Sequence, residues 1–211
     1  MPSAQFLRLP GPQQHRIVHA SLTTFADDGY DLASTNRIVR EAGISKGVLF
    51  KYFKDKEALF LYVAQVETET YFAGLPVDMN GSIFDWIRAA TAYKLRYIKE
   101  RPLTYRLFAR MAKEPGHPVY ARALRSQTDM IQRLGSETPR WGFGPLRPGV
   151  TQQQAMHLLQ WISTGLQEQF AAKLPDIVDE EFDAAFASIV AEFDTYLEIV
   201  KNGLYGEGAP S

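Results

Sequence analysis

STNRIVREAGISKGVLFKYFKDKEAL, residues 34–59, is the stretch that decides the fold of this 211-residue chain. It reads as a short helix that ends before Gly43, a second short helix that follows Ser45, and a third helix that begins near Lys56. Glycine readily takes the left-handed conformation that ends many helices. A serine hydroxyl accepts a hydrogen bond from a free amide of a first helical turn, so Ser34 and Ser45 are the expected N-caps. The pattern predicts a helix-turn-helix.

The second of these helices has an outer face of unusual composition. Leu49 and Phe53 are four residues apart and are expected to face the core, which leaves small, cationic and aromatic residues outside. Lysines bind phosphate, and a glycine lets a phosphate approach the backbone closely. The pattern therefore predicts contacts to duplex DNA, which we assign to Thr35, Asn36, Ser45, Lys46, Gly47, Val48, Phe50, Lys51, Tyr52 and Lys56. Lys46, Lys51 and Lys56 are assigned mainly to phosphate. Ser45 and Tyr52 are assigned to phosphate or to base edges.

A helix that precedes this stretch completes a small bundle. Residues 13–28 place Val18, Leu22 and Phe25 at the i, i+4 and i+7 positions of one helical face, and Gly29 is expected to stop the helix. The shared core of the three helices is predicted to contain Ile17, Phe25, Ile38, Leu49 and Phe53. Residues 1–12 read as a flexible arm.

At this point the chain resembles the TetR family of prokaryotic transcriptional regulators. The residues that carry the resemblance are Ile17, Ala20, Phe25, Gly29, Ser34, Ile38, Ala42, Gly43, Ile44, Ser45, Gly47, Leu49, Phe50, Phe53, Lys56 and Leu59. Two positions differ from the common family pattern, because Phe50 stands where tyrosine is usual and Tyr52 where histidine is common. The resemblance implies a dimeric, palindromic-operator-binding repressor that responds to a small-molecule effector.

The rest of the chain is expected to be helical. We predict helices at 56–73, 83–101, 103–113, 119–134, 152–173 and 177–202, which gives an all-α protein of about nine helices. The expected organisation is a flexible arm at 1–12, a helix-turn-helix domain at 13–56, an effector-binding and dimerisation domain at 57–202, and a flexible tail at 203–211.

Two apolar stripes mark the last two helices. They contain Leu158, Ile162 and Leu166 in one helix and Ile189, Phe193 and Leu197 in the other. At least half of each stripe is expected to be ordinary intramolecular core, and the remainder is predicted to form a homodimer interface. The family resemblance implies the same interface, because TetR-type regulators pair these helices in a four-helix bundle.

Large rings in the middle of the chain are candidates for an effector pocket. The predicted lining residues are Trp86, Tyr93, Tyr97, Phe108, Met111 and Trp161, and such walls suit a mostly apolar or amphipathic ligand. The alternative is a well-filled aromatic core. Residues 86–125 carry ten cations and two acids. Three interpretations of these cations stay open. They form a solvated surface, or Arg96 or Arg106 binds an anionic effector, or their electrostatic field attracts DNA.

Composition excludes several other classes. The net charge is −1, cysteine is absent, and no run of 18 apolar residues occurs, so we expect a cytoplasmic protein with no disulfides and no membrane partner. His15 and His19 have a metal-like spacing but no third ligand nearby in sequence, and no nucleotide-binding or hydrolase motif is found. We therefore expect no enzyme activity, no cofactor and no metal. The main alternative is a helical adaptor that uses its helix-turn-helix against protein, and a third is a helical enzyme without a recognisable motif.

Overall fold

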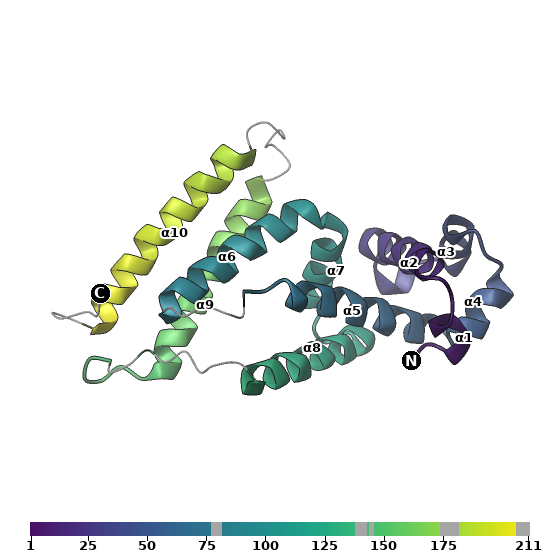
Figure 1. Ribbon diagram of the computed structural model, residues 1–211, viewed down its shortest axis with the longest axis horizontal. Coiled ribbons are helices and arrows are strands. Elements are labelled where there is room, and N and C mark those ends of the chain that lie inside the picture. The colour runs from purple at the N-terminus through teal and green to yellow at the C-terminus, as the bar shows by residue number, and fades with distance from the viewer. Residues whose placement is uncertain (77–81, 138–142, 144–145, 174–181, 206–211) are drawn as a thin grey trace. The chain divides into compact units, whose positions relative to one another are not determined.

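The computed structural model describes residues 1–76, 82–137, 143, 146–173 and 182–205, and within these ranges every regular element is a helix (Figure 1). The ten helices are α1 (Ala4–Leu7), α2 (Gly11–Leu32), α3 (Thr35–Ala42), α4 (Lys46–Tyr52), α5 (Lys56–Ala73), α6 (Ile83–Glu100), α7 (Pro102–Lys113), α8 (Pro118–Glu137), α9 (Gln152–Lys173) and α10 (Phe182–Tyr205). The predicted all-α class is confirmed. None of the helices described is both long enough and apolar enough to cross a lipid bilayer.

The first helix was not foreseen, and it corrects the prediction of a flexible arm at 1–12. Phe6 is fully buried, and its ring lies 5.7 Å from that of Tyr52 and 4.8 Å from that of Phe53. The amide of Ser3 donates to the backbone carbonyl of Tyr52 at 2.8 Å, and Gln14 Nε2 donates to the carbonyls of Leu7, the last residue of α1, and Leu9. Burial of one phenyl ring therefore docks the N-terminal segment beside α4.

Most other helix bounds agree with the periodicity, and two ends differ. Gly29 kinks α2 instead of ending it, because the chain re-enters helical geometry and continues to Leu32. Helix α10 continues to Tyr205, so the tail expected at 203–211 is helical at its start. The predicted helix start at 177–181 lies outside the described residues, as do residues 206–211.

The chain divides into two units. Unit 1 contains residues 1–73 and 101–137, and unit 2 contains residues 74–100 and 138–211. This division differs from the expected boundary at residue 56, because α5, α7 and α8 pack with the helix-turn-helix in one hydrophobic core. The largest fully buried side chains of that core are Phe6, Ile17, Phe25, Ile38, Leu49, Phe53, Leu59, Phe60 and Leu107, and they include all five that the sequence predicted.

Unit 2 is built on α6, α9 and α10, which pack against one another. Four of the six residues predicted to form the dimer interface are buried here within the single chain, namely Leu166, Ile189, Phe193 and Leu197. These four side chains pack in the core of unit 2, and the dimer interface stays a prediction. The core also holds one polar pair, in which the hydroxyls of Thr91 and Ser163 lie 2.8 Å apart.

Candidate nucleic-acid interface

The turn between α3 and α4 has the geometry that the sequence predicts. Gly43 adopts the left-handed conformation (φ 67°), and the amide of Ile44 donates to the carbonyl of Val39. Ser45 caps α4, since its Oγ accepts from the amide of Val48 at 3.2 Å. Ser34 occupies the N-cap of α3, but its side chain makes no capping hydrogen bond, which corrects that expectation.

Helix α4 has one buried side and one exposed side. Leu49 and the following Phe53 are almost fully buried. Lys46, Gly47 and Lys51 are exposed, and Phe50 is among the exposed large hydrophobic residues of the chain. At 100° per residue these four positions occupy one arc of the helix, so they form a continuous face of two cations, one aromatic ring and one bare backbone position.

The other predicted DNA contacts vary in accessibility. Asn36 and Ser45 are exposed, and Thr35 and Val48 are partly buried. Tyr52 is only 7% exposed, because its ring packs against that of Phe6. A base-edge contact by Tyr52 would therefore need its hydroxyl alone to reach the surface.

Lys56 has partners that the sequence did not indicate. Its ammonium donates to the carbonyls of Tyr30, Asp31 and Ala33 at 2.8, 3.1 and 3.3 Å, and it lies 4.6 Å from the centroid of the Tyr30 ring. Lys56 thus ties the start of α5 to the end of α2. Its unfavourable place in the first turn of a helix is explained by these carbonyls without a phosphate. By contrast, Lys46 and Lys51 have no ion-pair partner among the described residues.

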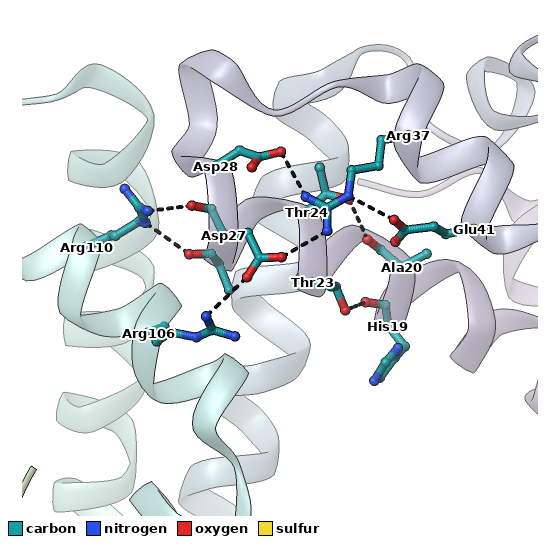
Figure 2. Close-up of polar contacts among 11 residues, drawn as sticks. His19, Ala20, Thr23, Thr24, Asp27, Asp28, Arg37, Glu41, Arg106 and Arg110 are labelled. Atoms are coloured by element: carbon teal, nitrogen blue, oxygen red, sulfur yellow. Dashed lines mark hydrogen bonds and ion pairs between the residues drawn. The ribbon is translucent and has the colours of Figure 1, made fainter. Parts of the chain in front are cut away.

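A polar network links this domain to α7, and no local sequence signal predicts it (Figure 2). Arg37 on α3 pairs with Asp27 at 2.9 Å, with Asp28 at 3.1 Å and with Glu41 at 2.8 Å. These carboxylates raise the pKa of the Arg37 guanidinium, the Glu41 hydrogen bond being the largest cause. Arg106 on α7 pairs with the other oxygen of Asp27 at 3.2 Å.

Most cations of the basic stretch at 86–125 are paired, each with a partner from the unit to which the cation belongs. Its partnered cations are Arg88 with Asp194, Arg96 with the Phe186 ring, Lys99 with the Phe182 ring, Arg101 with Glu67, Arg106 with Asp27, Arg110 with two backbone carbonyls, and Arg122 with Glu57. Structural pairing is therefore the main fate of these cations, an outcome that the sequence did not suggest.

The candidate effector residues are divided between the two units. Trp86, Tyr93, Tyr97 and Trp161 belong to unit 2, whereas Phe108 and Met111 belong to unit 1. Trp86 donates from Nε1 to the carbonyl of Pro76, and the rings of Tyr93 and Tyr97 lie 5.7 Å apart. Met111 is fully buried in the core of unit 1. The six are not brought together within either unit, and the effector pocket stays a prediction.

The exposed apolar side chains of unit 2 gather on α9 and α10. Trp161 is 69% exposed and Ile199 is 63% exposed, with Leu158 and Tyr196 less so. Trp161 and Ile199 line an open groove of about 420 Å³ together with Gly165, whose missing side chain leaves the helix surface flat. Trp161 therefore lies on an exposed apolar surface of α9.

The two histidines with metal-like spacing lie one helical turn apart on α2. The rings of His15 and His19 stack at 5.9 Å on the exposed side of α2. No group of three or more potential ligands occurs in the part of the chain that the structure describes.

These features define a helix-turn-helix domain of the DNA-binding type, with a cationic outer face on its second helix. Residues 17–63 match the model of the bacterial regulatory proteins of the tetR family. The chain carries the TetR-type helix-turn-helix, and its relatives are named as transcriptional regulators. The chain is 34% identical over 96 residues to the HTH-type transcriptional repressor Rv1474c of Mycobacterium tuberculosis. The aligned region covers 40% of this chain and 51% of that protein. The chain is 28% identical to the regulator HbdR of Aromatoleum over 35% of this chain and 32% of that protein.

The aligned region spans about a third to a half of these curated relatives. Solved structures match over nearly the whole chain. A TetR family transcriptional regulator from Chloroflexus aurantiacus superposes with a TM-score of 0.63, 19% identity, and coverage of 97% of this chain and 98% of that one. The fatty acid degradation regulator FadR from Bacillus halodurans gives a TM-score of 0.62 at 13% identity, with coverage of 96% and 100%. At these identities the likeness shows a shared fold.

Proposed function

We propose that the protein is a TetR-type transcriptional regulator that binds a palindromic duplex operator as a homodimer, and that it acts as a repressor. The observation that carries the proposal is the outer face of α4. Lys46, Gly47, Phe50 and Lys51 are exposed on a helix whose opposite side is buried, and the two lysines have no carboxylate partner among the described residues. Such a face can enter the major groove with cations at the phosphates on its rim.

Phe50 gives this face a particular chemistry. An exposed ring can contact a thymine methyl group or a deoxyribose, whereas a tyrosine would also donate to phosphate. We therefore assign Phe50 to apolar contact in the groove and Lys46 and Lys51 to phosphate. Lys56 is assigned to holding the DNA-binding helices together through the carbonyls of α2.

The test is binding to duplex DNA selected by the intact protein from a random-sequence library. Lys51→Ala should weaken binding about equally for selected and unselected duplexes. It should also make the log–log salt slope shallower by about 1, because the variant neutralises one phosphate fewer. Lys173→Ala, which removes the same charge from the last turn of α9, is the matched control and should leave both quantities unchanged. Failure of the wild-type protein to select any duplex would favour the adaptor alternative.

We assign dimerisation to the exposed apolar surface of α9 and α10. Leu158, Trp161, Tyr196 and Ile199 are large and exposed, and the absence of a side chain at Gly165 lets a second helix approach closely. A two-fold axis through this surface would present two copies of α4 to one DNA duplex. Mass measurement at micromolar concentration should give two chains, and a mass of one chain would contradict the assignment.

The effector part of the proposal rests on Lys94 and on the aromatic residues of α6. Burial lowers the pKa of Lys94, and this ammonium has no counter-ion among the described residues. Arg106 and Arg96, the cations that the sequence suggested, are already placed against Asp27 and the Phe186 ring. If the effector has an acidic group, Lys94 is therefore the cation of α6 that we assign to it. The rings of Trp86, Tyr93 and Tyr97 on the same helix suit an otherwise apolar ligand.

A further inference from the structure

Helix α2 breaks at Gly29, and side chains from other helices hold the backbone on both sides of the break. Gly29 has φ 72° and ψ 177°, a conformation that is essentially restricted to glycine. A break of this kind leaves carbonyls before it and amides after it without their helical partners. Such groups must find other partners when they are buried, because an unpaired buried amide or carbonyl is costly.

Both kinds of group are satisfied from outside the helix. Arg110 on α7 donates from Nε to the carbonyl of Ala26 at 3.0 Å and from Nη2 to that of Asp27 at 2.6 Å. On the other side of the break, the amide of Tyr30 donates to the hydroxyl of Tyr120 on α8 at 2.8 Å. The kink is therefore closed by one residue of α7 and one residue of α8.

The same segment is fastened to the first helix of the helix-turn-helix. One carboxylate oxygen of Asp27 accepts from Arg37 on α3 at 2.9 Å, and the other pairs with Arg106 on α7 at 3.2 Å. Asp27 is thus shared between α3 and α7, as Figure 2 shows. A displacement of α7 has a direct polar route to α3 through this carboxylate and through Arg110.

We propose that this junction, made by Arg106, Arg110 and Tyr120 on residues 26–30, sets the orientation of α3 and α4 for DNA. Arg110 and Tyr120 are then positioning residues for DNA binding. The inference rests on the proposed function, and it adds a route by which that function is regulated.

The positioning role differs from a phosphate contact in what it predicts. Nε and Nη2 of Arg110 donate to two carbonyls of α2, and Tyr120 is buried, so we assign neither side chain to a phosphate. Removal of either side chain should change the orientation of α3 and α4 and leave the number of phosphate contacts the same. The salt slope of binding should therefore be unchanged.

The variants are Tyr120→Phe, which removes one hydroxyl, and Arg110→Met, which keeps an unbranched stem and removes the donors. On duplexes selected by the wild-type protein, both should bind about 2- to 30-fold more weakly with an unchanged salt slope. Both should also tolerate insertion of a single base pair between half-sites better than the wild-type protein does, because loosely held DNA-binding helices adapt to altered spacing. Arg125→Met, which removes an exposed cation of α8 that has no ion-pair partner among the described residues, should behave like wild type.

A general loss of stability is tested with Val63→Ala, which leaves a cavity in the core of unit 1 and removes none of the polar contacts of the junction. This variant should melt earlier and keep the wild-type spacing preference per active molecule. Amide hydrogen exchange without DNA gives a second readout. In both junction variants the amides of residues 30–42 should exchange faster than in the wild-type protein, and those of α9 should exchange at the wild-type rate. Wild-type spacing preference in Tyr120→Phe and Arg110→Met, or wild-type exchange over 30–42, would overturn the proposal. If the wild-type protein selects no duplex, the exchange experiment still tests the junction while the proposed function fails.

Discussion

Replacing Gly29 with alanine is expected to destabilise unit 1 by about 2–4 kcal/mol. The backbone at Gly29 has φ 72° and ψ 177°, and holding a non-glycine residue there costs roughly 1–3 kcal/mol. A methyl group at this position would lie 3.3 Å from Tyr120 Oη and 3.4 Å from Arg110 Nη1. Both side chains take part in the junction, so relief of the crowding would weaken a hydrogen bond worth about 1 kcal/mol.

Urea unfolding followed by two probes would locate the effect. Far-UV circular dichroism reports the helices of both units. Trp86 and Trp161 belong to unit 2, so their fluorescence reports that unit. For a urea dependence of about 2 kcal/mol per molar, the dichroism midpoint of Gly29→Ala should fall by about 1–2 M. The fluorescence midpoint should fall less if the units unfold separately.

Gly47→Ala is the matched control. A Cβ at Gly47 would meet only Ser45 Oγ at 4.0 Å, and its backbone is helical, so alanine there should keep or slightly raise stability. Gly47→Ala should bind DNA more weakly if the backbone of α4 approaches a phosphate. The variant would then lose affinity for DNA without losing stability. A dichroism midpoint of Gly29→Ala equal to that of the wild-type protein would refute the claim that the kink is strained for other residues.

Three further outcomes follow from the structure. Trp161→Glu should give a mass of one chain with wild-type helicity, and a persistent dimer would contradict the interface on α9 and α10. Phe6→Ala should cost about 3–5 kcal/mol of unit 1 stability, because Phe6 is fully buried beside α4; a cost smaller than about 1 kcal/mol would show that α1 is not docked in solution. Lys94→Met should raise the thermal midpoint, because the wild-type protein buries an ammonium without a counter-ion among the described residues. Since the folded-state pKa of Lys94 is lowered from 10.5, the wild-type protein binds fewer protons when folded than when unfolded between that lowered pKa and 10.5. Its stability relative to Lys94→Met should therefore rise with pH over that window, and a constant difference would exclude this cause.

Local signals predicted the helix-turn-helix well. The left-handed Gly43 and the cap at Ser45 depend on a few neighbouring residues, and each takes its predicted geometry. Helix periodicity also placed the core, because apolar residues four apart share a face whatever they pack against. Once the core-facing residues of α4 were assigned, the remaining residues gave its outer face.

What the sequence could not supply is the identity of long-range partners. The stripes of α9 and α10 are equally consistent with intramolecular packing and with a dimer. Helical periodicity indicates that a face is buried, but it does not identify the partner that buries it. The structure buries Phe193 and Leu197 inside unit 2 and leaves Trp161 and Ile199 exposed. The proposed interface therefore moves from the centre of each stripe to its edge.

Lys56 illustrates the same limit for charges. A cation in the first turn of a helix opposes the helix dipole, and the sequence analysis assigned Lys56 to a DNA phosphate. In the structure three carbonyls at the end of α2 provide the compensation. A residue that breaks a local rule thus correctly signals a distant partner, but sequence alone does not distinguish a ligand from the protein's own backbone. Arg110 breaks no local rule, since cations are favourable near the end of α7, and its contact with the α2 kink could be found only from coordinates. The contacts that join the DNA-binding helices to the rest of unit 1 are of this second kind, so the coupling between them had no signature in the sequence.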